Sequence, residues 1–231
     1  MAYSKIGIIG AMDIEVDTLK GALTDKVVTR ISGIDFYSGK LFDKDVVIAK
    51  CGVGKVFSAV TAEIMILKFN VDAIINTGVA GSVSSLKIGD IAISTSVVQY
   101  DMDTTAIGDP LGLISGINII YFVSDERLSS TALNVAHGLG LRAELGVIAS
   151  GDKFVSDKKI KKHVETNFGA LCVEMEGGAI GHVAYINNVP FVVIRSISDD
   201  GDNSHAVEFA TFAKTSAEVS VKVIKGLLTS I

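Results

Sequence analysis

Short runs of isoleucine and valine alternate along this chain with longer segments of helical periodicity, and this alternation constrains the fold most. Several runs are continuously apolar, which is typical of strands covered on both faces. The alternation predicts an α/β fold in three layers (α/β/α) with a mixed central sheet. We expect strands over 5–12, 35–41, 45–51, 72–78, 90–101, 142–152, 170–175 and 190–198. We expect helices over 13–23, 55–69, 125–139, 157–168, 176–187 and 207–228.

The segment 101–120 has weak periodicity, and we expect a long loop there, since long loops in compact domains are often functional. The chain has 231 residues and only two prolines. Because no repeat, low-complexity segment or proline-rich linker divides it, we expect residues 1–231 to form one domain.

Charge and hydropathy narrow the range of partners. The net charge is −5, and no basic patch stands out, so nucleic acid is not an expected partner. We interpret the basic run "DKKIKKH" (157–163) as the solvated face of a helix. No run reaches the ~18 uncharged apolar residues of a membrane span, and the apolar segment 6–12 is too short for a signal peptide. The two cysteines, Cys51 and Cys172, lie in apolar strand-like segments, as buried thiols do in a reducing compartment, so we expect a cytoplasmic protein.

Acidic residues and glycines recur where the predicted strands end. Glu15 follows the first strand, Glu174 and Glu176 flank the end of the seventh, and Asp199 follows the last, with Arg195 inside it. Ligands of open α/β sheets collect at the carboxyl ends of strands, so the pattern predicts a pocket with several carboxylates. Clustered carboxylates repel and their pKa values separate, so one can act as general acid while another is a base. That division suits hydrolysis of a glycosidic bond.

Other motifs are weak. "GVGK" (52–55) is neither a P-loop nor G-x-G-x-x-G, and we interpret it as a tight strand-to-helix turn. "GIIGAM" also lacks the dinucleotide-binding spacing, and no G-x-S-x-G nucleophile motif occurs. The four histidines lie far apart in the sequence, and we interpret His182 as a packing residue. We therefore expect no metal site and no cofactor.

Eight short segments, taken together and in order, indicate a protein family more specifically than any one of them does alone. They are "IGIIGAMDIEV", "GVGK", "INTGVAGS", "KIGDIAIS", "YDMDTTAIG", "SGDKFV", "VEMEGGAIGHVA" and "RSISDDGD". Together they closely resemble the bacterial 5′-methylthioadenosine/S-adenosylhomocysteine nucleosidases of the nucleoside phosphorylase superfamily, over nearly the whole chain. The resemblance implies a nucleoside phosphorylase-like fold. It also implies hydrolysis of the N-glycosidic bond of methylthioadenosine, S-adenosylhomocysteine and 5′-deoxyadenosine, which releases adenine and the 5′-substituted ribose.

The resemblance implies roles for individual residues. Glu15 would activate the attacking water, Asp199 would protonate adenine N7, and Glu176 would bind the ribose hydroxyls and stabilise the developing positive sugar. Phe154 would stack on adenine and the backbone of Val155 would bind its edge. The further substrate contacts implied are Met12, Val53, Ala80, Gly81, Glu174, Met175, Arg195, Ser198 and Phe209.

Two departures from the family pattern matter. Many members have Ser where this chain has Val79, and that hydroxyl often helps to hold the water, so Glu15 and Arg195 would have to hold it here. The family also completes the 5′-pocket with a loop of a second subunit that matches 104–113. An aromatic residue is common where Ile107 stands. The resemblance therefore implies a homodimer and leaves the 5′-group preference open.

Three alternatives remain. A nucleoside phosphorylase needs cationic groups and glycine amides for phosphate, whereas "GAMDIEV" has two acids and no arginine at that place. The second alternative is a nucleosidase for another 5′-substituted nucleoside, such as futalosine. The active-site acids do not distinguish it from a nucleosidase for methylthioadenosine. A non-catalytic nucleotide-binding module has no need for Glu15, Glu176 and Asp199 together.

Overall fold

The computed structural model describes residues 3–199 and 206–231, with side chains for all of these except 206–211. The helices are α1 (Asp13–Gly21), α2 (Lys55–Phe69), α3 (Glu126–Gly138), α4 (Lys158–Phe168), α5 (Gly177–Ile186) and α6 (Ala206–Ser230), with a short 3₁₀ helix η1 (Thr105–Ile107). The strands are β1 (Lys5–Gly10), β2 (Thr24–Ile31), β3 (Ile34–Leu41), β4 (Lys44–Lys50), β5 (Ala73–Ser82), β6 (Ile91–Gln99), β7 (Tyr121–Val123), β8 (Ala143–Ser150), β9 (Ala170–Glu174) and β10 (Phe191–Asp199).

The strands form one mixed sheet in the order β10-β6-β8-β9-β5-β1-β4-β3-β2, with β7 added to β6. The strand β5 is central, since it pairs in parallel with β1 and β10 and also meets β9 at its carboxyl end. All ten residues of β5 are buried. The carboxyl ends of β5, β9 and β10 therefore come together at one place.

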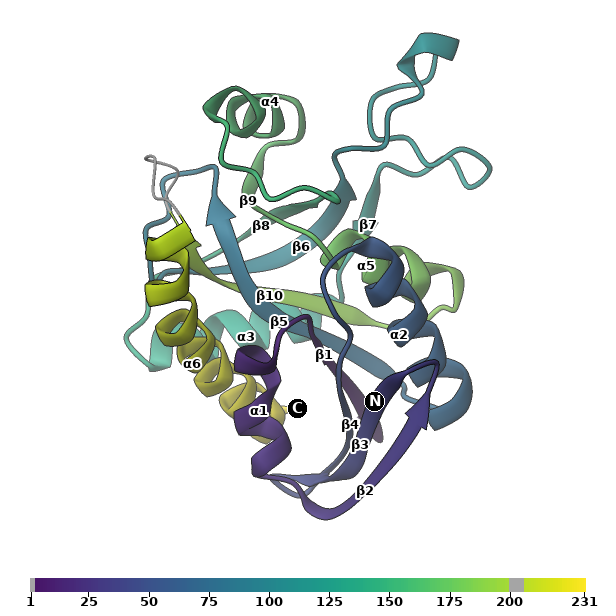
Figure 1. The fold of residues 1–231 in the computed structure, drawn as a ribbon, viewed down its shortest axis with the longest axis vertical. Helices are drawn as coiled ribbons and strands as arrows, with labels where there is room; N and C mark the ends of the chain where they lie inside the picture. Colours follow the sequence, from purple (N-terminus) through teal and green to yellow (C-terminus); the bar gives the residue numbers. More distant parts are fainter. Residues whose placement is uncertain (1–2, 200–205) are drawn as a thin grey trace.

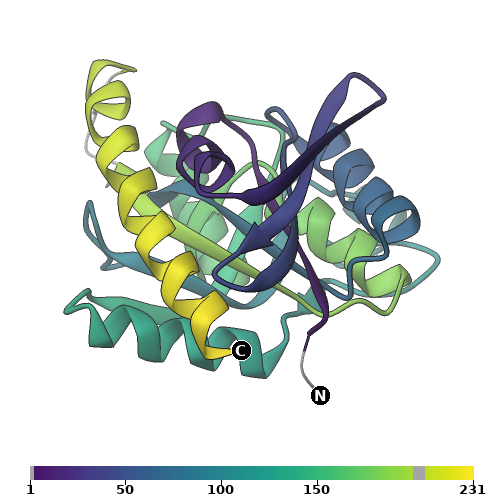
Figure 2. The same ribbon diagram turned by 90° about the horizontal axis from the view of Figure 1, so that it is seen from below.

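Helices cover both faces of the sheet, as Figures 1 and 2 show. The helices α1, α3 and α6 pack together on one face, and α2 and α5 pack together on the other. Val16 of α1 and Leu227 of α6 belong to one apolar core, and Met65 of α2 and Ile180 of α5 to a second. The predicted three-layer α/β/α fold with a mixed sheet is confirmed.

Each predicted strand and helix is present, with ends that shift by a few residues, but two strands were missed. The strand β2 is exposed on both faces, so it has no apolar pattern, and it exists because it pairs with β3. The other, β7, has three residues, too few for a periodicity. The expected loop over 101–120 is irregular apart from η1 and an isolated β-bridge between Ile114 and Ile119, and it projects from the body of the molecule (Figure 1).

The basic run at 157–163 was interpreted as the solvated face of a helix, and the structure differs at one residue. Its residues in α4 are exposed at Lys158, Lys159, Lys162 and His163, but Lys161 is buried on the inner face. The prediction of a wholly solvated face was therefore wrong at Lys161.

Two minor predictions are confirmed. Cys51 and Cys172 are buried free thiols, and His182 stacks on Phe122 with ring centroids 4.8 Å apart. None of the helices in the described part of the chain is both long and apolar enough to cross a membrane.

Candidate active site

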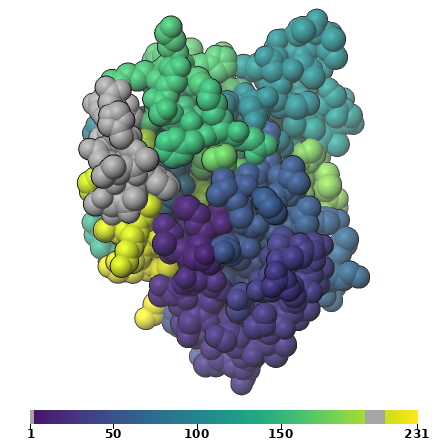
Figure 3. Space-filling model, in the orientation of Figure 1, coloured from purple at the N-terminus to yellow at the C-terminus, as the bar shows by residue number. Residues whose placement is uncertain are grey.

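A cavity of about 350 Å³ opens where β1, β5, β9 and β10 end. Its wall combines apolar side chains with the carboxylates of Glu15, Glu174, Glu176 and Asp199. On the face drawn in Figure 3, the purple N-terminal residues, the blue residues around α2 and the green residues around α4 lie side by side. The site is therefore built from segments that are distant in the sequence.

Glu15 enters the cavity from the third position of α1, and its side chain is almost fully buried. One carboxylate oxygen accepts hydrogen bonds from the backbone N–H of Ala11 (2.7 Å) and Met12 (2.9 Å), and the other from that of Val79 (3.1 Å). The bond from Met12 satisfies a free donor at the helix N-terminus. Burial raises the pKa of Glu15, although Arg195 and these hydrogen bonds oppose the shift. A carboxylate held in this way is a fixed and relatively basic proton acceptor.

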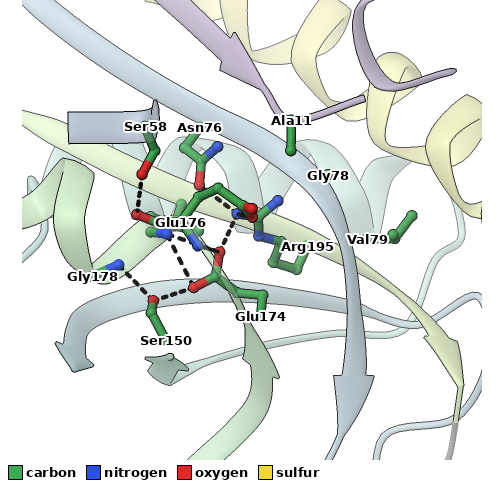
Figure 4. Close-up of polar contacts among 12 residues, drawn as sticks. Ala11, Ser58, Asn76, Gly78, Val79, Ser150, Glu174, Glu176, Gly178 and Arg195 are labelled. Atoms are coloured by element: carbon green, nitrogen blue, oxygen red, sulfur yellow. Dashed lines mark hydrogen bonds and ion pairs between the residues drawn. The ribbon is translucent and has the colours of Figure 1, made fainter. Parts of the chain in front are cut away.

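Arg195, in the middle of β10, is fully buried behind the cavity. Its Nη2 donates to Asn76 Oδ1 (2.6 Å), forms an ion pair with Glu174, and lies 3.4 Å from Glu176 Oε2 (Figure 4). Burial disfavours its charge, but Glu174, Glu176 and Glu15 together raise the pKa of Arg195. A buried cation of this kind is stable only with such partners.

Glu174 is the structural member of the group. It accepts hydrogen bonds from the hydroxyl of Ser150 and from the backbone N–H groups of Glu176 (3.0 Å) and Gly177 (2.8 Å). Ser150 in turn accepts from the backbone N–H of Gly178 (2.6 Å). These bonds attach the end of β9 to the first turn of α5 and so fix the position of Glu176 between them (Figure 4).

Glu176 faces the cavity with one oxygen on the backbone N–H of Gly54 (2.9 Å). Burial, the neighbouring charge of Glu174 and that of Glu15 raise the pKa of Glu176 to about 7, against the opposing effects of Arg195 and Gly54. The acid therefore changes its protonation state near neutral pH, as functional-site carboxylates often do. The "GVGK" turn supplies the N–H that orients it.

The close approach of these groups requires glycine at position 78. A Cβ on Gly78 would lie 2.0 Å from Arg195 Nη1 and 2.6 Å from Glu15 Oε1. Nη1 and Nε of Arg195 have no hydrogen-bond partner among the described residues. Glu15 and the unpartnered Nη1 therefore meet beside the backbone of β5, next to the cavity.

Asp199 stands at the other end of the cavity, as the last residue of β10. The register of β10 against β5 shifts between Ile197 and Asp199, and such irregularities re-aim side chains near active sites. Asp199 Oδ1 accepts a hydrogen bond from Lys161 Nζ (2.8 Å) in a largely buried ion pair. A Cβ on Gly81 would lie 2.8 Å from Asp199 Oδ2, so glycine leaves room for this carboxylate.

The structure brings together nearly all residues singled out from the sequence. Arg195 lies behind the wall instead of in it, and the side chain of Phe209 lies outside the described residues. The others line the cavity: Met12, Glu15, Val53, Ala80, Gly81, Phe154, Val155, Glu174, Met175, Glu176, Ser198 and Asp199.

Sequence reasoning missed Asn76, Ser150 and Lys161, which hold the carboxylates and the arginine. Asn76 and Ser150 stand one or two residues before glycines in strands that end at the site, a weak signal. Lys161 gave none, because it is one of several lysines in α4. No group of three His, Cys, Asp or Glu in the described ranges is placed to hold a metal ion.

Comparison with known proteins shows the family of the chain. The family model of the phosphorylase superfamily matches residues 5–229. The chain belongs to this superfamily. The 5′-methylthioadenosine/S-adenosylhomocysteine nucleosidase of Shewanella denitrificans is 41% identical over 230 residues, covering 98% of this chain and 100% of that protein. Within the superfamily, the chain belongs with these nucleosidases.

Solved structures give the same result for the fold. The nucleosidase of that name from Neisseria meningitidis, in complex with methylthio-immucillin-A, superposes with a TM-score of 0.95 at 33% identity and covers 99% of this chain and 100% of its own. A futalosine hydrolase mutant of Helicobacter pylori superposes with a TM-score of 0.93 at 36% identity, over 99% of this chain and 100% of that one. The predicted family, the nucleoside phosphorylase-like fold and the class of N-glycosyl hydrolases are confirmed.

Proposed function

We propose that this nucleosidase hydrolyses the N-glycosidic bond of 5′-methylthioadenosine, S-adenosylhomocysteine and 5′-deoxyadenosine. The products are adenine and the 5′-substituted ribose. The observation that carries the proposal is the convergence of Glu15, Glu176 and Asp199 on one cavity, each held by different partners. Three acids in three settings can divide the tasks of base, sugar ligand and acid.

Glu15 acts as the base that activates water. Three backbone N–H groups orient its carboxylate, and burial raises its pKa, which strengthens it as a proton acceptor near neutral pH. Position 79 has no hydroxyl to hold the water. Glu15 therefore holds the water, and the buried Nη1 of Arg195, which has no partner in the described part of the chain, lies beside Glu15 behind the wall.

Asp199 acts as the acid for the leaving base. In this step Asp199 is a carboxylic acid with its proton on Oδ2, while Oδ1 accepts the hydrogen bond of Lys161. As the bond between C1′ and N9 breaks, its electron pair moves into adenine, and Asp199 transfers that proton to N7. The water oxygen bonds to C1′ while Glu15 takes the water proton. A positioned acid and a positioned base each contribute roughly 10²- to 10⁴-fold to the rate.

Glu176 binds the ribose hydroxyls. With a pKa near 7, Glu176 is partly ionised at neutral pH, and its carboxylate can accept a hydrogen bond from a ribose hydroxyl. This interaction is stronger in the transition state than in the ground state, because the sugar becomes cationic there. Met175 packs against the ribose, Phe154 stacks on adenine, and Met12 and Val53 line the 5′-pocket. Their position on the cavity wall supports these assignments.

A homodimer would complete this 5′-pocket. Apolar side chains are exposed along one face of α2, with Val56 75% and Phe57 55% exposed, and Ile107 on the projecting loop is 81% exposed. An apolar face of this extent usually marks a protein interface. Val53 lies at the start of the face and also lines the cavity, so a second copy seated there, with its loop 104–113, would reach the site.

The dimer is tested by Val56→Asp. We expect it to give a monomer by light scattering, with an increased KM, because the charge cannot be buried in an interface. Val27→Asp is the matched control, since Val27 is 60% exposed on the edge strand β2, and it should stay dimeric. A monomeric wild-type protein with full activity contradicts the proposal.

A phosphorylase and a futalosine-type nucleosidase are the remaining candidates. Phosphate would meet the carboxylates of Glu15, Glu174 and Glu176 at the cavity wall, which disfavours an anionic nucleophile. The likeness to the futalosine hydrolase makes hydrolysis of futalosine a second proposal, because the same three acids serve either substrate.

The first experiment measures base release from methylthioadenosine, S-adenosylhomocysteine, 5′-deoxyadenosine and futalosine, without phosphate and again with added phosphate. We expect adenine and free sugar at a rate that is independent of phosphate. Release only with phosphate, as a sugar phosphate, would reject Glu15 as the base for water. Faster release from futalosine than from the adenine nucleosides would favour the second candidate.

A further inference from the structure

We propose that Lys161 is a positioning residue for Asp199, which fixes the acid and supplies the positive charge beside it during departure of the base. The inference rests on the proposed role of Asp199 as the acid. It assigns a task to a residue of α4 that contributes no atom to the cavity wall as described.

The geometry of the pair is specific. Lys161 Nζ lies 2.8 Å from Asp199 Oδ1, and the two side chains are only 10% and 12% exposed. Asp199 Oδ2 lies against the backbone of Gly81. One oxygen is therefore held by the lysine while the carboxylate faces the cavity.

The position of Lys161 in its helix is unusual for a lysine. Lys161, Val164 and Phe168 form the buried face of α4, and Val164 and Phe168 belong to an apolar cluster with Val173 of β9. An apolar residue at 161 would continue this face, whereas burial of an ammonium group is unfavourable unless it is paired. Packing alone does not explain a lysine at position 161. Its hydrogen-bond partner, Asp199, is the proposed acid, and this pairing explains it.

The pair also suits the flow of charge in the reaction. Negative charge builds up on adenine as the bond to C1′ breaks, and after proton transfer it remains on Asp199. With Lys161 beside it, Asp199 ends the step in an ion pair instead of as an isolated buried charge. A fixed charge placed where charge develops stabilises the transition state.

The decisive variants are Lys161→Met and Lys161→Arg. Methionine fits the apolar face but leaves the carboxyl group of Asp199 without its cation, so we expect some loss of stability. The kcat for methylthioadenosine should fall about 10- to 100-fold, less than the full contribution of a general acid, with KM nearly unchanged. Arginine keeps the cation, so Lys161→Arg should recover most of the activity. Lys162→Met, one residue on, is the control, because Lys162 is exposed and pairs with Glu165, and it should match the wild type.

A second substrate separates positioning from general damage. A 4-nitrophenyl 5-methylthioriboside releases a stable phenolate and needs no protonation of the leaving group. Lys161→Met and Asp199→Asn should cleave it at nearly the wild-type rate while they cleave methylthioadenosine slowly. Because Lys161 acts through Asp199, the double variant should be no slower on methylthioadenosine than Asp199→Asn alone.

The outcomes are distinguishable. Full activity of Asp199→Asn on methylthioadenosine would reject the acid and hence the proposed mechanism, whatever Lys161 does. A slow Asp199→Asn together with a fully active Lys161→Met would reject only the inference. Equal losses of Lys161→Met on both substrates, or no recovery with arginine, would also reject it.

Discussion

The two ends of the cavity hold their carboxylates in contrasting ways. At one end, three carboxylates share one buried arginine, in a cluster that we call the arginine cluster (Glu15, Glu174, Glu176 and Arg195). At the other end, Asp199 has Lys161 as a cation of its own, and we call these two residues the lysine pair.

This difference matches the charges that the proposed reaction creates. The sugar becomes positive beside the arginine cluster, where carboxylates outnumber cations, and the base becomes negative beside the lysine pair, where the ammonium group of Lys161 stands next to the proposed acid. The arginine cluster also joins β5, β9, β10 and α1, whereas the lysine pair joins one helix to the end of one strand. We therefore expect the cluster to serve stability and activity, and the lysine pair mainly activity.

The largest effect is expected for Arg195→Met. It leaves buried carboxylates without a cation, which costs about 3–5 kcal/mol in the free energy of unfolding, and it should abolish hydrolysis. Urea unfolding followed by circular dichroism measures the loss. Arg30→Met is the control, since Arg30 and Asp35 form an exposed ion pair, worth about 0–1 kcal/mol. Equal losses for both variants would mean that the cluster is not a stabilising unit.

The next effect concerns pH. Folding raises the pKa of Glu176 from its usual 4.5 to about 7, so the folded state binds this proton more tightly than the unfolded chain does. Stability from this group is complete below pH 4.5 and is lost as the pH rises to about 7, by on the order of 3 kcal/mol. Glu15 acts in the same direction.

Glu176→Gln isolates this contribution. His182 has a lowered pKa and acts in the opposite direction below its usual value, while Asp13 and Asp72, also lowered, act at more acidic pH. Only the difference between the wild type and Glu176→Gln is therefore assigned to Glu176. The variant should lose less stability between pH 4.5 and 7, and identical pH profiles would show that Glu176 is not protonated there.

A smaller effect is expected for Gly78→Ala. The added methyl group would displace both Arg195 Nη1 and Glu15, and such overpacking costs about 1–3 kcal/mol. Gly81→Ala is the matched change at the lysine pair, where the methyl group meets only the end of Asp199. We expect Gly78→Ala to lower both stability and kcat, and Gly81→Ala to lower kcat with little loss of stability. The reverse order of melting temperatures would contradict the distinction between the two ends.

The smallest change in stability is expected for the double variant Lys161→Met/Asp199→Asn, within about 1 kcal/mol, since both partners of the buried pair become neutral groups of similar shape and neither charge is left unpaired. Its kcat for methylthioadenosine should nevertheless fall about 10²- to 10⁴-fold. Calorimetry and adenine release on the same preparation test both statements. A large loss of stability would show that the lysine pair is structural.

Much of this protein follows from local patterns. The apolar runs and helical stripes define most of the elements, because periodicity is a short-range property. Glu15, Glu174, Glu176 and Asp199 could be singled out because the ends of adjacent strands meet at one edge of a sheet. The roles proposed for them rest on the family resemblance, which the order of eight motifs carries and no single motif does.

Only the tertiary structure decided how these acids are held. Lys161 and Asp199 are 38 positions apart, and their contact depends on how α4 packs against β9. The strand β2 exists through its pairing with β3, and the raised pKa of Glu176 depends on burial beside Glu174 and Glu15. Sequence determines which groups stand at the strand ends, but desolvation and pairing between distant segments decide which of them carry charge.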